Sequence, residues 1–192
     1  MNNILNLPFF YNLRFLVAGN QTKTKKFIKD TYLRYKCRSV IDFGCGTGDF
    51  APIFSPDEYT GIDINRRYID FAKNKYPYRF ICQNILKYNF NKQTFDASIF
   101  ISTLHHLSDQ EVKIIMPKIS DLTNKIIVVV DLNPKTSILK KSFMQLDRGK
   151  YIRTLKEKTD LLSPFADIVE VSHFSTGQAA QTGIVLRPHA KI

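Results

Sequence analysis

Two short runs of this chain are apolar at consecutive positions, without the polar alternation of a half-exposed strand. They are ASIFI at 97–101 and KIIVVVD at 125–131. Such runs are typical of parallel strands that helices cover on both faces. Segments with helical spacing separate them from further strand-like runs, and this alternation predicts a doubly wound, mostly parallel α/β sheet. The predicted strands are 39–43, 58–63, 78–83, 95–101 and 125–131, and the predicted helices are 65–76, 108–122 and 134–146.

The two ends of the chain depart from this alternation. Apolar residues from Leu5 to Val17 follow helical spacing, and a basic helix is predicted over 21–35. Near the other end, 166–174 and 182–190 read as strands with no long helix between them, which predicts an antiparallel addition at one sheet edge. A length of 192 residues fits a single domain, in which we expect an N-terminal helical cap at 1–37 and a core at 38–192.

A glycine-rich turn follows the first predicted strand. Gly44, Gly46 and Gly48 form a G-x-G-x-G pattern, and a helix is expected to start near Asp49. Glycines remove Cβ atoms and permit positive φ, so a ligand can approach the backbone closely. The spacing differs from the G-x-G-x-x-G of dinucleotide sites. Asp42 and Asp49 would also repel a pyrophosphate and attract a cation.

A second acidic residue ends the next predicted strand. Asp63 lies 21 residues after Asp42, a place from which a carboxylate accepts hydrogen bonds from ribose hydroxyls. A ligand that combines adenosine with a positive charge and an amino-acid tail satisfies both features. S-adenosylmethionine is the obvious candidate, whereas a nicotinamide dinucleotide is disfavoured.

From Ser39 to Asp131 the chain resembles the class I S-adenosylmethionine-dependent methyltransferases. The motif from Asp42 to Gly48 matches the first signature of that family, Asp63 matches its ribose-binding acid, and FDASIFISTLHHL matches its fourth strand and the turn after it. The resemblance implies a Rossmann-like fold, with a polar residue beside the adenine and two residues lining the methionine part. The implied cofactor residues are Asp42, Gly44, Cys45, Gly46, Gly48, Asp63, Ile64, Asn84, Ile85, Ile101 and Ser102.

Three residues near the predicted strand ends are candidates for catalysis. His105 and His106 follow the fourth strand, and an imidazole titrates in the range that a general base needs. Asp131 ends the fifth strand and is a candidate for orienting the methyl acceptor. The alternatives are a helix cap or a pocket wall for the histidines, and a turn residue for Asp131.

Two further residues are candidate substrate contacts. Tyr11, with its aromatic neighbours, belongs either to a lid over the cofactor or to a helix stripe packed on the sheet. Arg148 binds an anionic acceptor or forms a surface ion pair with Asp147 or Glu157. No metal site is expected, because the three cysteines lack the spacing of metal ligands.

The net charge of +11 leaves the class of acceptor open. Seven basic residues lie in 23–38 and eight in 135–158, on solvated helix faces or on a surface for RNA or protein. We favour a small-molecule acceptor, with RNA or protein methylation as the alternative. A membrane-surface binding protein is a third interpretation, against which Asn6, Pro8 and Asn12 interrupt the first apolar segment. Unpaired thiols, the absence of a signal-peptide pattern and the lack of an apolar span predict a cytoplasmic protein without membrane insertion.

Overall fold

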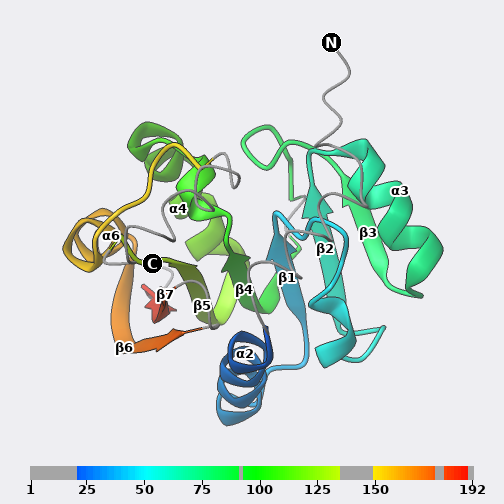
Figure 1. Cartoon of the computed structure of the whole chain (residues 1–192), viewed down its shortest axis with the longest axis horizontal. Coiled ribbons are helices and arrows are strands. Elements are labelled where there is room, and N and C mark those ends of the chain that lie inside the picture. The colour runs from blue at the N-terminus through cyan, green and yellow to red at the C-terminus, as the bar shows by residue number, and fades with distance from the viewer. Residues whose placement is uncertain (1–20, 91–92, 135–148, 176–179, 190–192) are drawn as a thin grey trace.

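Seven strands form one sheet in the computed structural model, which describes residues 21–90, 93–134, 149–175 and 180–189. The strand order is β3-β2-β1-β4-β5-β7-β6 (Figure 1). Neighbours from β3 to β5 are parallel, whereas β7 runs antiparallel to both β5 and β6. The strands are β1 (Val40–Phe43), β2 (Tyr59–Asp63), β3 (Arg79–Cys82), β4 (Phe95–Ile101), β5 (Thr123–Leu132), β6 (Ala166–Ser175) and β7 (Ala180–Pro188).

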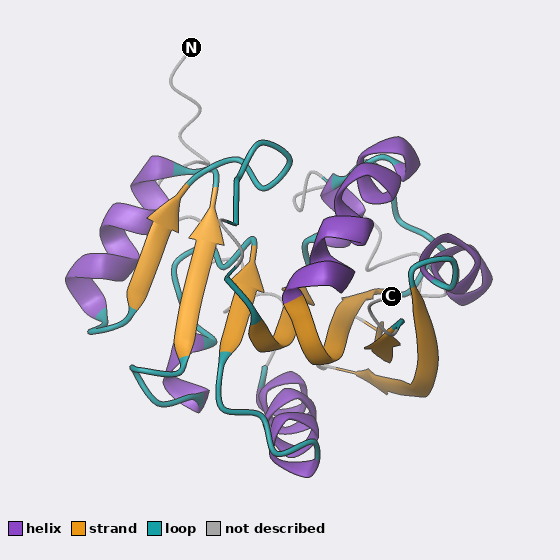
Figure 2. Cartoon of the chain, turned by 180° about the vertical axis from the view of Figure 1, so that it is seen from behind, coloured by secondary structure: helices purple, strands orange, loops and turns teal. Residues whose placement is uncertain are grey.

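Helices pack on both faces of the sheet and bury two separate apolar clusters. The helices α2 (Thr22–Arg34) and α3 (Arg66–Lys75) contribute to one cluster, and α4 (Asp109–Leu122) and α6 (Leu155–Leu162) contribute to the other. Figure 2 shows the helices and strands from behind. Because both faces are covered, β5 is buried from Ile126 to Leu132, as its unbroken apolar run predicts.

The doubly wound sheet and its antiparallel edge are therefore confirmed. The predicted helix near Asp49 is wrong, because only a short 3-10 turn, η2 (Ala51–Ile53), follows the glycines. A proline accounts for this difference. Pro52 is tolerated in the first turn, whereas Pro56 disfavours the helical conformation of Ser55 and ends the turn.

Helix α6 was not expected from the apolar pattern. It has eight residues, and its buried face consists of Lys158, Leu161 and Leu162, so a lysine interrupts the apolar stripe. A capping box marks its start: Thr154 Oγ1 accepts from the Glu157 backbone N–H, and Glu157 Oε2 accepts from the Thr154 backbone N–H. The motif T-x-x-E is the sequence signal that could have identified this helix.

The structure describes only part of the two ends of the chain, so it tests only some of the predictions made for them. The predicted helices at 5–17 and 134–146 lie wholly or almost wholly outside the described residues, and the division into cap and core stays a prediction. Within the predicted cap, α2 packs on the sheet through buried Ile28 and Tyr32, and Thr24 Oγ1 donates to Gln181 Oε1 at 2.7 Å. None of the helices described is both long and apolar enough to cross a membrane. The three cysteines form no disulfide.

Candidate functional site

The glycine turn has a backbone that side chains would obstruct. Gly44, Gly46 and Gly48 have φ values of 75°, 55° and 77°, in the left-handed region that glycine tolerates best. A Cβ atom on Gly44 would lie 2.5 Å from Thr103 Oγ1, and one on Gly48 would lie 2.7 Å from the Phe80 ring. The turn therefore needs glycine for its conformation and for its close packing.

A small pocket opens beside this turn. It lies at the carboxyl ends of β1 and β4, which are neighbours in the sheet although they are not consecutive strands. Open α/β sheets bind ligands at such topological switch points. The pocket is lined by Gln21, Asp42, Gly44, Cys45, Asp49, Phe50, Ile101 and Ser102.

Asp42 places a buried carboxylate in the pocket. It is 1% exposed, and its Oδ2 accepts from the Tyr59 hydroxyl at 2.8 Å. Its Oδ1 has no hydrogen-bond partner among the residues that the structure describes. Burial raises the pKa of Asp42 to about 7, the Tyr59 hydrogen bond lowers it, and the nearby Asp63 raises it further. A cationic group of a ligand would fit here, because it would favour the ionised carboxylate.

The negative charge that Asp49 brings to the glycine turn is partly offset by a lysine, which the sequence did not predict. Its carboxylate accepts from Thr47 Oγ1 at 2.6 Å, and it lies 3.6 Å from Lys75 Nζ. The lysine therefore offsets part of the charge of Asp49.

Asp63 connects the second strand to the glycine turn. Its Oδ2 accepts from the Gly46 backbone N–H at 2.9 Å, and its Oδ1 accepts from the Asn65 backbone N–H at 2.7 Å. Burial raises the pKa of Asp63, and these backbone hydrogen bonds lower it. An ionised carboxylate has about four lone-pair sites, so it can still accept from a ribose hydroxyl beside these backbone donors. Ile64, the next residue, is 68% exposed and offers an apolar surface beside the carboxylate.

Of the remaining predicted cofactor residues, Cys45, Ile101 and Ser102 line the pocket, whereas Asn84 and Ile85 follow β3 and are not among its lining residues. Asn84 Oδ1 accepts from the Leu86 backbone N–H at 2.9 Å and so starts a turn, and Ile85 packs partly against a core cluster. Ser102 has a φ of 52°, which is uncommon for a residue with a side chain and frequent at functional sites. Cys45 is buried, and burial raises its thiol pKa well above the usual range, so it is not a reactive thiolate.

The predicted catalytic residues fall into two environments. His105 and Asp131 are each 1% exposed, and His105 Nδ1 is hydrogen-bonded to Asp131 Oδ1. His106 is exposed, with its ring centroid 4.3 Å from that of His105. The fold thus joins two residues that are 26 positions apart, while the two adjacent histidines have different exposure. Tyr11 and Arg148, the candidate substrate contacts, lie outside the described residues.

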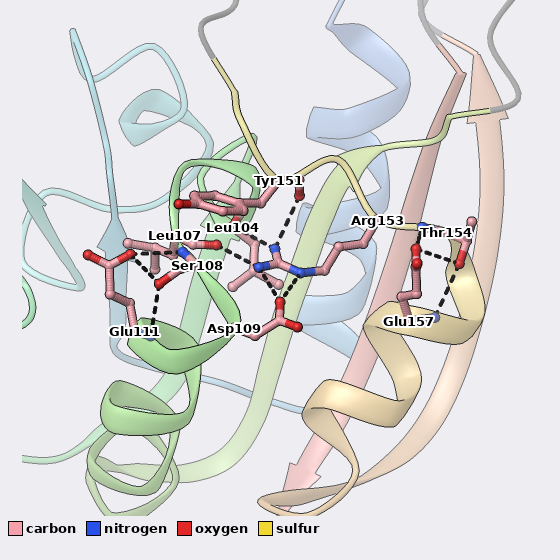
Figure 3. Close-up of polar contacts among 9 residues, drawn as sticks. All are labelled: Leu104, Leu107, Ser108, Asp109, Glu111, Tyr151, Arg153, Thr154 and Glu157. Carbon is pink, nitrogen blue, oxygen red and sulfur yellow. Dashed lines mark hydrogen bonds and ion pairs between the residues drawn. The ribbon is translucent and has the colours of Figure 1, made fainter.

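Arg153 is a buried residue for which the sequence predicted no individual role (Figure 3). It is 6% exposed, and its guanidinium bonds Asp109 Oδ1 at 2.7 and 2.8 Å. It also donates to the carbonyl oxygens of Leu104, Leu107 and Tyr151. These contacts fasten the segment before α6 to the 3-10 turn η3 (Leu104–His106), which carries both histidines.

Two more residues complete the surroundings of His105. A Cβ atom on Gly149 would collide with the imidazole ring, so the backbone of Gly149 packs directly on His105. Lys158 is 2% exposed, and its Nζ donates to the carbonyl oxygen of Leu132. Burial lowers the pKa of Lys158, and the charge of Asp131 raises it. Lys158 lies three residues from Leu155 and from Leu161, so it falls on the apolar face of a short helix, and this spacing is the sequence signal for its burial.

Comparisons with known proteins agree with the geometry. Residues 40–125 match a family model described as a methyltransferase domain. A probable tRNA methyltransferase 9B of Mus musculus is 36% identical over 107 residues, and its Homo sapiens counterpart is 32% identical over 108. Each match covers 56% of this chain, and the chain spans only 22% of the length of these relatives.

Solved structures share the fold at low sequence identity. A magnesium protoporphyrin IX methyltransferase from Synechocystis with bound SAH is 16% identical, with a TM-score of 0.67 over 86% of this chain and 82% of that one. A human N-acetylserotonin methyltransferase in complex with SAM is 17% identical, with a TM-score of 0.71 over 96% and 56%. These similarities establish the sheet and its helices as a methyltransferase-type fold.

Proposed function

We propose that this chain is a class I S-adenosylmethionine-dependent methyltransferase and that it transfers a methyl group from that cofactor to a small-molecule acceptor. The observation that carries the proposal is the pocket beside the glycine turn. A buried carboxylate oxygen of Asp42 faces no partner among the described residues there. A cationic methionyl group would supply the missing interaction, whereas a pyrophosphate would be repelled.

The residues that would hold the cofactor have distinct tasks in this proposal. Asp42 would face the cationic end, Asp63 the ribose hydroxyls, and Ile64 and Asn84 the adenine. Bound S-adenosylmethionine supplies a methyl carbon whose bond to the sulfonium sulfur breaks as a bond to the acceptor forms, leaving S-adenosylhomocysteine. The chain itself therefore needs to align the acceptor and exclude water.

A base is needed only where the acceptor atom carries a proton at the working pH. We assign this task to His105, since Asp131 holds its Nδ1 side and so orients the ring. The buried position of His105 keeps bulk water away from it, which suits proton transfer within a closed site. Exposed His106 is the alternative base.

RNA is the second candidate acceptor. The curated relatives carry the name of a probable tRNA methyltransferase, and α2 exposes Lys23, Lys26 and Lys29. Lys26 is paired with Asp30, which offsets part of this charge. We favour the small molecule because the aromatic residues interleaved with these basic ones, Phe27, Tyr32 and Tyr35, pack against the apolar core and do not form an exposed surface for stacking on bases. Free thiols at all three cysteines support a cytoplasmic location as part of the proposal.

Titration calorimetry of the full chain tests the cofactor assignment. S-adenosylmethionine is expected to bind, and NAD is expected to give no heat of binding. Asp63→Ala should weaken binding about tenfold to hundredfold, because the Gly46 and Asn65 N–H groups lose their acceptor and the ribose loses a partner. Asp57→Ala removes an exposed carboxylate before β2 and is the matched control. Binding of NAD in place of S-adenosylmethionine would contradict the proposal.

The acceptor class needs a separate measurement. Association with tRNA that weakens steeply as salt rises would support the RNA alternative, because phosphate contacts release counterions. The combined variant Lys23→Gln, Lys26→Gln and Lys29→Gln should then reduce both the affinity and the salt slope. Absent or salt-insensitive association would remove RNA as the acceptor and leave the small-molecule proposal in place.

A further inference from the structure

Lys158 is a buried charge that methyl transfer as proposed above does not use. Lysine is almost never fully buried unless it is paired, yet this side chain is 2% exposed on the face of α6 that enters the core. Its neighbours on that face are Leu161 and Leu162, which belong to an apolar cluster. A hydrogen bond to one carbonyl oxygen does not by itself require a charged side chain.

The backbone of Leu132 links Lys158 to the buried pair of His105 and Asp131. Lys158 Nζ donates to the Leu132 carbonyl oxygen, and the Leu132 N–H donates to Asp131 Oδ1 at 2.7 Å. The same Asp131 oxygen bonds His105 Nδ1. Hydrogen bonds therefore connect the Lys158 ammonium, the Asp131 carboxylate and the His105 imidazole, in that order, at the carboxyl end of β5.

We propose that Lys158 is the counter-charge of Asp131, and that it keeps the His105 imidazole neutral with its proton on Nδ1. The physical reason is charge balance in a low-dielectric environment. With Lys158 present, the carboxylate already faces a positive charge and gains less from a second one on His105. Without Lys158, a protonated imidazole becomes the nearest group that can balance the carboxylate.

The other charged groups around His105 do not take over this task. Arg153, from the segment before α6, directs its guanidinium to Asp109, so its charge is matched there. His106 lies on the same turn and is exposed to solvent. Within the described residues, Asp131 forms an ion pair with His105 alone, which leaves Lys158 as the cation that acts on it from α6.

NMR titration of the histidine rings in the full chain tests this charge balance directly. His105→Gln assigns the resonance. In Lys158→Gln, which can still donate to Leu132, the pH at which His105 takes up a proton should rise by about one to two units. Lys158→Arg retains the charge and should restore the wild-type value. Lys156→Gln is the matched control, since it removes an exposed lysine of the same helix that pairs with Asp160.

A shift in Lys158→Gln no larger than in Lys156→Gln would overturn the proposal. If Lys158→Gln does not fold, the wild type still decides: a neutral His105 with its proton on Nδ1 at about pH 7 supports the proposal, and a protonated ring refutes it. The consequence for activity rests on the proposed function. If His105 is the base, the acidic limb of the pH profile of kcat should shift to higher pH in Lys158→Gln, by the same amount as the protonation of His105. The KM for S-adenosylmethionine should be unchanged. The NMR measurement needs no acceptor, so its failure is distinguishable from a failure of the proposed methyl transfer.

Discussion

Replacing Asp42 by asparagine should change how the stability of the protein depends on pH. Asparagine keeps a carbonyl oxygen for the Tyr59 hydroxyl, which now donates to Asp42 Oδ2 at 2.8 Å. It removes the ionisable group while nearly preserving its volume. The substitution therefore isolates the effect of a buried carboxylate from the effect of packing.

The expected size follows from the pKa of Asp42. Burial raises it from 3.8 to about 7 in the folded chain, an increase of about 3 units. Between these values the folded protein holds a proton that the unfolded chain has released. The contribution of Asp42 to the free energy of unfolding is therefore fully present below about pH 4 and is lost as the pH rises through about 7. At about 1.4 kcal/mol per unit, the loss is about 4 kcal/mol.

Urea unfolding of the wild type and Asp42→Asn across this pH range measures the difference. The variant should gain stability relative to the wild type as the pH rises, and exposed Asp57→Asn should show no such trend. Affinity of the wild type for S-adenosylmethionine should rise over the same range, because ionised Asp42 attracts its cation, and the variant should lose this dependence. A constant stability difference from about pH 4 to about pH 8 would show that the carboxylate is not destabilised by burial.

Three further substitutions test individual contacts. Asp63→Ala should also lower the free energy of unfolding by about 1–3 kcal/mol, measured in urea, because two backbone N–H groups lose their acceptor. Gly48→Ala should cost about 2 kcal/mol or more in the same assay, since its φ is 77° and the new Cβ meets the Phe80 ring; an unchanged midpoint would show that the turn relaxes freely. Arg153→Met should lower the free energy of unfolding by about 3 kcal/mol or more, because it leaves buried hydrogen-bond partners unpaired. Arg34→Met removes an exposed ion pair and should lower it by at most about 1 kcal/mol. Equal thermal shifts for the two variants would contradict the anchoring role of Arg153.

The features that the sequence predicted correctly depend on neighbours along the chain. The apolar run at 125–131 reports that both faces of β5 are covered, and three glycines in five positions report a turn with left-handed backbone. The place of Asp63 at the end of the second strand was also predicted correctly, whereas its role at the ribose stays a prediction. Local patterns also have limits, because the turn after the glycines was expected to open a helix that Pro56 prevents.

Contacts between distant segments could not be predicted in this way. His105 and Asp131 were each candidates, yet only the register of β4 beside β5 brings them into contact and buries both. Arg153 and Lys158 looked like two of many basic residues in a charged stretch. Their environments become visible only when α6 packs beside β5 and the segment before it closes over η3.

The sequence by itself determined the sheet, the glycine turn and the acidic residue after the second strand, because strand burial and backbone conformation depend on side chains close in the chain. The tertiary structure alone decided which histidine is buried, which carboxylate it meets, and which lysine and arginine surround that pair. Burial and long-range electrostatics depend on segments that the chain brings together only on folding, so no local pattern specifies them.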